Sequence, residues 1–302
     1  MRPFHADDAS DLTQAAALLH EGFPARPVSF WLAALHRVQR LADNRAMGQP
    51  LGYFMLNQGQ PVGVALTPAS WRERADGTRV RLVNISSWYV RPDFRWRAGV
   101  MLRAIMADKS CIYTDLTPTP EVQKMLPVVG MQPINQGVAI HCLPLLALKP
   151  AQGAQARVLG PADALPAPAT SEQWRPLPAS VQAHRELGCT VLSLGMGVRT
   201  GVGNDAQLLV LRALRVRGLS AAQVVFCDSQ AQLLRDLGAL ARCLLPRGVA
   251  LLVCDTRQAR SSATALFRPR ERWFARGDSF EGRTDVLGSE LCLILGASAP
   301  SR

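Results

Sequence analysis

The chain has 302 residues, of which 48% are hydrophobic and 19% charged, a balance typical of globular proteins and a length sufficient for two domains. Its net charge of +11 is spread over both halves, without a basic tail, zinc-finger spacing or a basic stripe interleaved with aromatic residues. Nucleic acid is therefore not an expected partner.

The seven cysteines are odd in number and form no C-x-x-C pair, so neither a disulfide framework nor a metal site is expected. Residues 1–8 lack the apolar core of a signal peptide, and no run approaches the roughly 20 apolar residues of a membrane span. We therefore expect a cytoplasmic protein without a membrane span.

Two amphipathic helices are predicted at the start of the chain. Asp11 followed by Gln14 indicates a capped first helix. Ser29 opens a second helix, which carries Trp31 and Leu35 on one face.

A β-hairpin is predicted next. Its apolar strands lie at residues 51–56 and 61–67, and Gly59 in the connection suits a tight turn. A third strand is expected over residues 79–90.

A strand–helix–strand unit completes the predicted first half. Apolar residues at helical spacing predict a helix over residues 98–106, and a strand follows at residues 111–116. A short helix begins after Pro120 and ends before Gly130, and a strand at residues 138–143 is expected to close the first sheet.

Residues 149–178 are rich in Ala, Pro, Gly and Gln, which is typical of a linker, although residues 156–159 could add a short strand to the first sheet. The predicted domains are therefore residues 1–148 and residues 179–302, on either side of this linker.

The second half repeats the order of elements of the first. A short helix at residues 181–187 precedes strands at residues 190–194, 207–214 and 223–227. Ser229 with Gln232 forms a capping-box signature before an amphipathic helix, and residues 249–254 form the next strand. Both halves thus contain a right-handed crossover in a partly parallel sheet, which indicates an internal duplication.

The residues that most clearly indicate a binding site lie in the segment 88–102, where a predicted strand passes into a predicted helix. The amides of the first helical turn lack partners within the helix, and the helix dipole favours negative charge, so a pyrophosphate can bind there. Arg91, Arg95 and Arg97 add donors suited to phosphate oxygens. Ala98 and Gly99 would let a ligand approach the backbone closely.

This segment resembles the main motif of the GNAT superfamily of acyl-coenzyme A N-acyltransferases. Val90, Pro92, Arg95, Ala98 and Leu102 fill the places of its pattern V-x-P-x-x-R-x-x-A-x-x-x-L. The order of elements over residues 4–143 agrees with that superfamily, and the whole chain is similar to a bacterial subgroup of uncharacterised tandem GNAT proteins.

The resemblance implies an α/β fold of two tandem GNAT-like domains, each a mixed twisted sheet flanked by helices, with the second domain degenerate. It implies acetyl-CoA or another acyl-CoA as co-substrate. The implied cofactor-binding residues are Trp88, Tyr89, Val90, Arg95, Trp96, Arg97, Ala98, Gly99 and Val100.

The sequence departs from the superfamily at three points. Val100 replaces the third small residue of the loop. The tyrosine that many members use to protonate the leaving thiolate falls at Leu126. The strand before the motif offers Asn84, Ser86 and Ser87 in place of a glutamate base. The catalytic residues are therefore not identified.

The crossover of the second half lacks arginine and glycine and carries Asp228 where a phosphate would lie, so this half is not expected to bind coenzyme A. Two short segments, His184…Gly188-Cys189 and Ser289-Glu290-Leu291, resemble segments in the second half of the same tandem subgroup. From the residues alone, Asp285, Ser289 and Glu290 are interpreted as turn and strand-edge residues.

Two function classes remain open. The first is an enzyme that moves an acyl group, with acetyl preferred, from coenzyme A to an amine or hydroxyl of an unknown small-molecule or peptide acceptor. The alternative is a non-catalytic acyl-CoA-binding or protein-interaction module. A homo-oligomer is compatible with either class.

Overall fold

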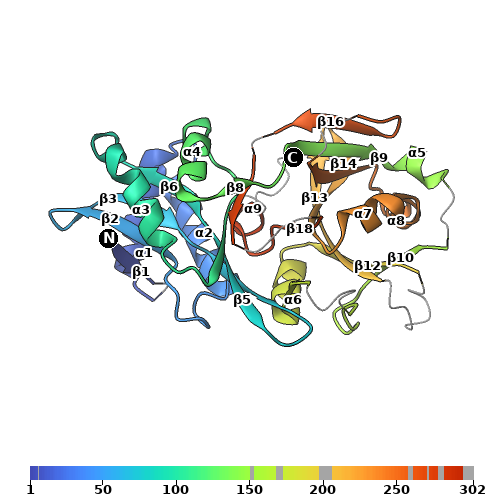
Figure 1. Ribbon diagram of the computed structural model, residues 1–302, viewed down its shortest axis with the longest axis horizontal. Helices are drawn as coiled ribbons and strands as arrows, with labels where there is room; N and C mark the ends of the chain where they lie inside the picture. Colours follow the sequence, from blue (N-terminus) through green and yellow to red (C-terminus); the bar gives the residue numbers. More distant parts are fainter. Residues whose placement is uncertain are drawn as a thin grey trace.

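The computed structural model describes residues 1–5, 7–149, 153–167, 173–196, 206–257, 261–270, 272–277 and 282–294. Figure 1 shows two halves that lie side by side, each built from a β-sheet with helices packed against it. The predicted α/β class with two similar halves is confirmed.

The first half contains most of the predicted elements, including both opening helices, the hairpin and the crossover helix. In chain order they are β1 (Arg2–Phe4), α1 (Ala9–Gly22), α2 (Val28–Leu41), β2 (Gly52–Asn57), β3 (Gln60–Leu66), β4 (Ala69–Glu73), β5 (Arg79–Asn84), β6 (Ser86–Val90), η1 (Pro92–Arg97), α3 (Ala98–Ile105), β7 (Cys111–Asp115), α4 (Pro120–Met125), η2 (Leu126–Val129) and β8 (Gln132–Pro133).

Two local predictions in this half are wrong. The N-cap of α1 is Asp8, whose carboxylate accepts from the backbone N–H groups of Ser10 and Asp11, while Asp11 pairs with Arg2 instead. The strand expected over residues 79–90 is two strands, β5 and β6, that bend apart. The strand β4 was not predicted.

The remaining elements begin with the strand expected at residues 138–143. In chain order they are β9 (Gly137–Cys142), α5 (Leu143–Ala147), β10 (Gln155–Val158), β11 (Arg175–Pro176), α6 (Pro178–Glu186), β12 (Thr190–Gly195), β13 (Gln207–Val216), β14 (Leu219–Cys227), α7 (Gln230–Arg235), α8 (Leu237–Leu244), η3 (Leu245–Arg247), β15 (Leu251–Thr256), β16 (Ala265–Pro269), β17 (Phe274–Arg276), β18 (Thr284–Asp285) and α9 (Glu290–Leu293).

Both predicted crossovers are present. β5 and β7 are parallel neighbours joined through α3, and β14 and β15 are parallel neighbours joined through α7 and α8. The predicted cap of the second crossover is also confirmed, because the Ser229 hydroxyl accepts from the Gln232 N–H at 3.2 Å.

The two halves exchange strands. β9 lies between β15 and β16 in the eight-stranded sheet of the second half, where Figure 1 shows it in green. In return, β17 lies between β7 and β8 in the sheet of the first half. The expectations that residues 138–143 and 156–159 join the first sheet are therefore wrong, since β10 pairs with β12. The domain boundaries at residues 148 and 178 stay predictions.

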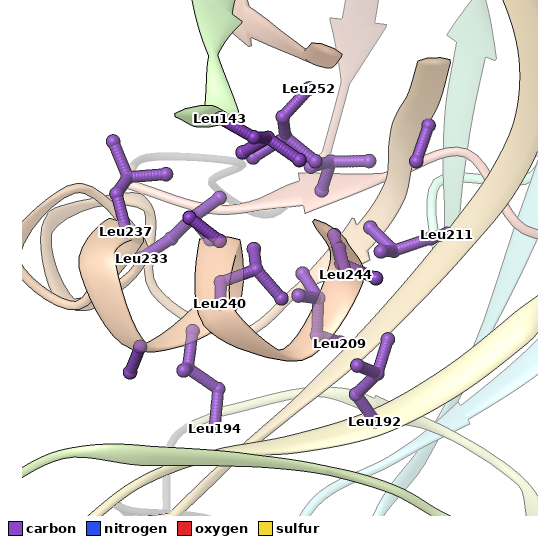
Figure 2. Packing of buried hydrophobic residues seen from close by; sticks show 14 of the residues in the cluster. Leu143, Leu192, Leu194, Leu209, Leu211, Leu233, Leu237, Leu240, Leu244 and Leu252 are labelled. Atoms are coloured by element: carbon purple, nitrogen blue, oxygen red, sulfur yellow. The ribbon is translucent and has the colours of Figure 1, made fainter. Parts of the chain in front are cut away.

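The core of the second half is a leucine-rich layer between α7, α8 and the eight-stranded sheet (Figure 2). Leu237, Leu240 and Leu244 follow helical spacing on α8 and meet Leu192 and Leu209 from the strands. Fully burying one leucine stabilises the folded state by roughly 1.5–3 kcal/mol.

Candidate functional site

The first half opens into a cleft where β5 passes into β6. β5 pairs with β7 as far as Asn84 and Thr114, and the Ile85 N–H still donates to the Thr114 carbonyl at 2.7 Å. From Ser86 onward the strand pairs with β3 instead. The strands β6 and β7 therefore separate, and the gap between them is not closed by backbone hydrogen bonds.

Ser87 lies at this point of separation in a left-handed conformation, with φ of +44°. Such a conformation costs a non-glycine residue of the order of 1–3 kcal/mol, and strained residues cluster at functional sites. Its N–H and its hydroxyl both donate to Oε2 of Glu290, at 3.2 and 3.1 Å. The bend thus turns the polar groups of Ser87 towards a residue that lies 203 positions later in the chain.

A cavity of about 520 Å³ occupies the cleft. Its walls come from the connection between α1 and α2 and the start of α2, from β6, from the end of β7 and the residues after it, and from the start of α9. Residues lining it include Phe23, Trp31, Ser86, Trp88, Thr117 and Val122. Its size is that of a pocket for a small molecule.

Two acidic side chains line this cavity, Asp115 at the end of β7 and Glu290 at the start of α9. Both are buried, with exposures of 6% and 3%. Oε1 of Glu290 also accepts a hydrogen bond from the Thr117 hydroxyl. Burial raises the pKa of Asp115 well above its usual range, and the Glu290 carboxylate raises it further, against a smaller lowering by the Thr117 N–H.

Glu290 reaches the first half because the segment of residues 284–290 is tightly anchored. Arg72 on β4 donates to both carboxylate oxygens of Asp285, at 2.5 and 2.7 Å, and to the Leu287 carbonyl. His184 accepts from the Gly288 N–H at 3.0 Å. Figure 1 shows α9 between the two halves. The interpretation of residues 285 and 289–290 as turn and strand-edge residues is therefore wrong for Glu290, which lies in the cleft.

The predicted cofactor-binding residues lie on consecutive elements beside the cleft, and two of them, Val90 and Ala98, are buried. Trp88, Tyr89 and Val90 lie on β6; Arg95, Trp96 and Arg97 lie in the 3₁₀ turn η1; and Ala98, Gly99 and Val100 form the first turn of α3. Trp96 and Val100 are 80% and 64% exposed. A Cβ added at Gly99 would meet only Cε of Met125, at 3.8 Å, so the protein's own packing does not require a glycine there.

The three arginines differ in their partners. Arg91 forms a hydrogen-bonded ion pair with Glu21 on α1, at 2.9 to 3.1 Å, and Tyr89 donates to the same carboxylate. Arg97 donates to the Leu56 carbonyl at 3.3 Å. Arg95 is exposed and forms no hydrogen bond or ion pair with the described residues. Arg95 is therefore the arginine best placed to contact a ligand.

Leu126, at the position of the superfamily's tyrosine, is fully buried in the core of the first half. It cannot donate a proton, and α4 presents Val122 to the cavity. Sequence reasoning missed Asp115 and the placement of Glu290. An acidic residue within the apolar run Leu287–Leu293 was the one signal that could have indicated Glu290.

In the second crossover, residues 282–285 cover the end of β14 and the start of α7. β18 pairs with β14 at Phe226 and Cys227, and the Gln230 N–H at the start of α7 donates to the Gly282 carbonyl at 2.7 Å. Asp228 is buried and forms an ion pair with Arg175 at 2.6 Å. Asp228 is thus a structural residue, and the place that a ligand would take is filled by residues 282–285.

The described residues offer no candidate for a membrane span or for a metal site. None of the helices in this part of the chain is both long and apolar enough to span a bilayer. No group of three or more His, Cys, Asp or Glu side chains in it has the arrangement of a metal site.

Comparison with solved structures identifies N-acetyltransferases of the same fold. A GCN5-related N-acetyltransferase from Anabaena variabilis matches with a TM-score of 0.57 and 12% identity, covering 90% of this chain and 71% of its own. Eis1 from Mycobacterium abscessus matches with a TM-score of 0.54 and 12% identity, covering 91% and 73%. A GCN5-related N-acetyltransferase from Kribbella flavida matches with a TM-score of 0.51 and 13% identity, covering 88% and 68%.

No protein-family profile and no curated protein matches the sequence. At these low identities the structural matches show the fold alone. The chain therefore has the fold of the GCN5-related N-acetyltransferases, as the resemblance of residues 88–102 implied.

Proposed function

We propose that the protein transfers an acyl group from an acyl-coenzyme A to an acceptor bound in the cleft between β6 and β7. The observation that carries the proposal is the position of the cavity. It lies where β6 leaves β7, beside the exposed turn that bears Arg95 and the first amides of α3. One strand thus connects a surface suited to phosphate with a pocket suited to a small acceptor.

In this proposal the pyrophosphate of the donor lies against the start of α3 and binds the guanidinium of Arg95. The pantetheine arm runs beside β6 from Val90 towards Ser86 and Ser87. The free edge of β6 offers it backbone hydrogen-bonding groups, because the strand separates from β7 there. Val100, which replaces the third small residue of the loop, is exposed and lies outside the buried face of α3.

Acetyl is the acyl group that we propose, with acetyl-CoA as the co-substrate. Placing an acyl donor and an acceptor in one enclosed cleft contributes much of the rate of such a transfer, because the two reactants meet in a fixed orientation. The GNAT fold supports this assignment only as an analogy.

The alternative, a module that binds acyl-coenzyme A without catalysis, is favoured by the burial of Leu126 at the position of the superfamily's proton donor. Release of free thiol from acetyl-CoA in the presence of an acceptor separates the two functions. The enzyme produces thiol in proportion to acylated acceptor, and the binding module produces none.

Binding of the donor is tested by changing Arg95 and Arg97 together to Ala. Coenzyme A should raise the melting temperature of the unchanged protein, since a ligand at 100 times its dissociation constant adds about 2.7 kcal/mol to the free energy of unfolding. The variant should lose this shift while the melting temperature without ligand changes little, because Arg95 is an exposed charge and Arg97 gives up a single long hydrogen bond to the Leu56 carbonyl.

The matched control changes two exposed basic residues outside the turn, Arg103 and Lys109, to Ala, and it should keep the full shift. An unchanged protein that is folded and shows no shift at millimolar coenzyme A would contradict the proposal. Equal shifts in the variant and the control would contradict the assignment of the arginines.

A further inference from the structure

We propose that the second half has a binding site of its own, a cavity between α7 and β9 that takes an uncharged, mainly apolar molecule bearing a hydroxyl group. The site is independent of the proposed acyl transfer, because it shares no lining residue with the cleft between β6 and β7. His141 on β9 is the residue that would bind the hydroxyl group.

The cavity has a volume of about 300 Å³ and lies between the eight-stranded sheet and α7. β9 contributes Ala139 and His141 to its walls, and α7 contributes Leu233 and Leu234. His141 faces this side of the sheet because it is the register partner of Leu252 on β15. Leu252 belongs with Leu233 to the leucine-rich layer (Figure 2). The volume suits a small molecule.

The imidazole of His141 is the first argument for a ligand. His141 is buried, with 5% exposure, and neither Nδ1 nor Nε2 has a hydrogen-bond partner within the described part of the chain. Burial, with a smaller effect of the Lys149 charge, lowers the pKa of His141 to about 4. The ring is therefore neutral at pH 7 and offers one N–H donor and one bare nitrogen. Native proteins leave few buried polar groups unpaired, because unpaired groups destabilise the fold.

The polar neighbours of this histidine differ from it in their partners. Nε2 of Gln230 donates to the Thr284 hydroxyl at 2.9 Å and to the Asp255 carbonyl at 3.3 Å. Among the buried side-chain atoms of the described lining residues, only the two ring nitrogens of His141 and Oδ2 of Asp255 lack a partner. The unused hydrogen-bonding capacity of the cavity is thus concentrated on these two residues.

Burial also limits the charge of the ligand. None of the described lining residues is Lys or Arg, so an anion such as a phosphate or a carboxylate would lack a counter-ion. The titratable groups that line the cavity, His141, Cys254 and Asp255, all have pKa values that burial shifts towards the uncharged form. A cation would need the charge of Asp255, which burial opposes. A hydroxyl group both donates and accepts without a charge, and Leu233 and Leu234 offer apolar contact to the rest of the molecule.

Water alone matches this cavity poorly. A water molecule occupies roughly 30 Å³ in the liquid, so the cavity has room for about ten, whereas His141 and Asp255 offer three unpartnered atoms to hold them. Waters beside the apolar wall are weakly held, and their release by an apolar ligand favours binding.

The test uses the full chain with 4-methylphenol, which carries a hydroxyl group on an apolar ring. Three probes of similar shape accompany it: toluene without a polar group, 4-methylbenzoate as an anion and 4-methylbenzylamine as a cation. Calorimetric titration should give one site for 4-methylphenol, with an affinity about tenfold or more above that for the other probes. Among the five histidines, the ring nitrogen resonances of His141 should shift when 4-methylphenol is added.

Two variants locate the site. His141→Phe keeps an aromatic ring and removes both nitrogens, and its lost signals assign the His141 resonances. It should lose the preference for 4-methylphenol over toluene, while its melting temperature without ligand stays the same or rises, because the fold loses no hydrogen bond. Leu234→Trp fills the cavity from its half-exposed wall and should abolish binding. Leu219→Trp, at a similarly exposed leucine on β14 outside the cavity, is the matched control and should bind 4-methylphenol normally.

Four outcomes would overturn the inference: no binding of any probe by the folded protein, which would leave water as the occupant; equal affinities for 4-methylphenol and toluene; tighter binding of a charged probe; or unchanged binding of 4-methylphenol by His141→Phe. Should His141→Phe fail to fold, the tryptophan variants decide, because equal affinities in Leu234→Trp and Leu219→Trp would place the ligand elsewhere.

Discussion

At the scale of single residues, Asp255 at the end of β15 is a buried acid outside the cleft between β6 and β7. Its Oδ1 accepts from Nδ2 of Asn135 at 3.2 Å, and its Oδ2 has no hydrogen-bond partner among the described residues. Burial raises the pKa of Asp255 from 3.8 to about 7. Between these values the folded protein holds a proton that the unfolded chain has lost. The contribution of Asp255 to stability therefore falls as the pH rises from about 4 to about 7, and it is constant above that.

We expect the variant Asp255→Asn to be more stable than the unchanged protein at pH 8, by about 2–4 kcal/mol, because it no longer buries a charge. The asparagine keeps an oxygen to accept from Asn135. The difference should shrink towards zero near pH 4, where the carboxyl is protonated in both states. Urea unfolding at the two pH values measures this, with the exposed Asp7→Asn as control. A variant that is less stable at pH 8 would contradict the shifted pKa.

At the scale of elements, the segment of residues 284–290 links the two halves. As β18 it completes the edge of β14, and through Asp285 it binds Arg72 on β4, whose side chain is 1% exposed. Breaking a buried ion pair by removing one partner leaves an uncompensated charge, which typically costs 3–5 kcal/mol.

Arg72→Met should therefore lower the free energy of unfolding by about 3–5 kcal/mol. The matched control is Arg79→Met on the neighbouring strand β5, because Arg79 pairs with Glu73 at the surface and its loss should cost less than about 1 kcal/mol. Both values come from urea unfolding monitored by circular dichroism. Similar losses in the two variants would mean that burial does not govern the strength of the Arg72 pair.

Elements were predicted well where local patterns specify them. The capping box at Ser229 and the apolar spacing of residues 98–106 both describe contacts within one turn or one face of a helix, and both were correct. The passage of residues 88–102 from a strand into a helix was predicted for the same reason, since its motif is continuous in sequence, and its role in cofactor binding stays a prediction.

Contacts between distant elements could not be predicted in this way. The pattern of β9 indicates a buried strand, but it does not specify whether its neighbours are β7 or β15, because each half offers a similar sheet edge. The position of Glu290 could not be predicted for the same reason. Its place in the cleft is marked by hydrogen bonds from Ser87 and Thr117, which are 203 and 173 positions away, and spacing carries no information over such distances.

At the scale of the whole molecule, the two halves contain similar crossovers that differ in the residues that cover them. The first keeps a free strand edge, an exposed turn with Arg95, and a cavity. The second has its strand edge covered by β18 and its helix start occupied by the Gly282 carbonyl. The same C-terminal segment that closes the second crossover carries Glu290 into the first. One segment therefore covers the crossover of the second half and lines the cavity of the first.

This asymmetry predicts one coenzyme A per chain. Calorimetric titration of the full chain should give a stoichiometry close to one, because among the described residues only the first crossover carries, at its helix start, an exposed arginine without a hydrogen-bonded partner. In the variant with Arg95 and Arg97 changed to Ala, the heat of binding should vanish rather than fall by half, since no second site would remain to take up ligand. Two equivalent sites per chain, or half of the heat retained in that variant, would show that residues 282–285 do not exclude the cofactor and that the donor site extends to the second half.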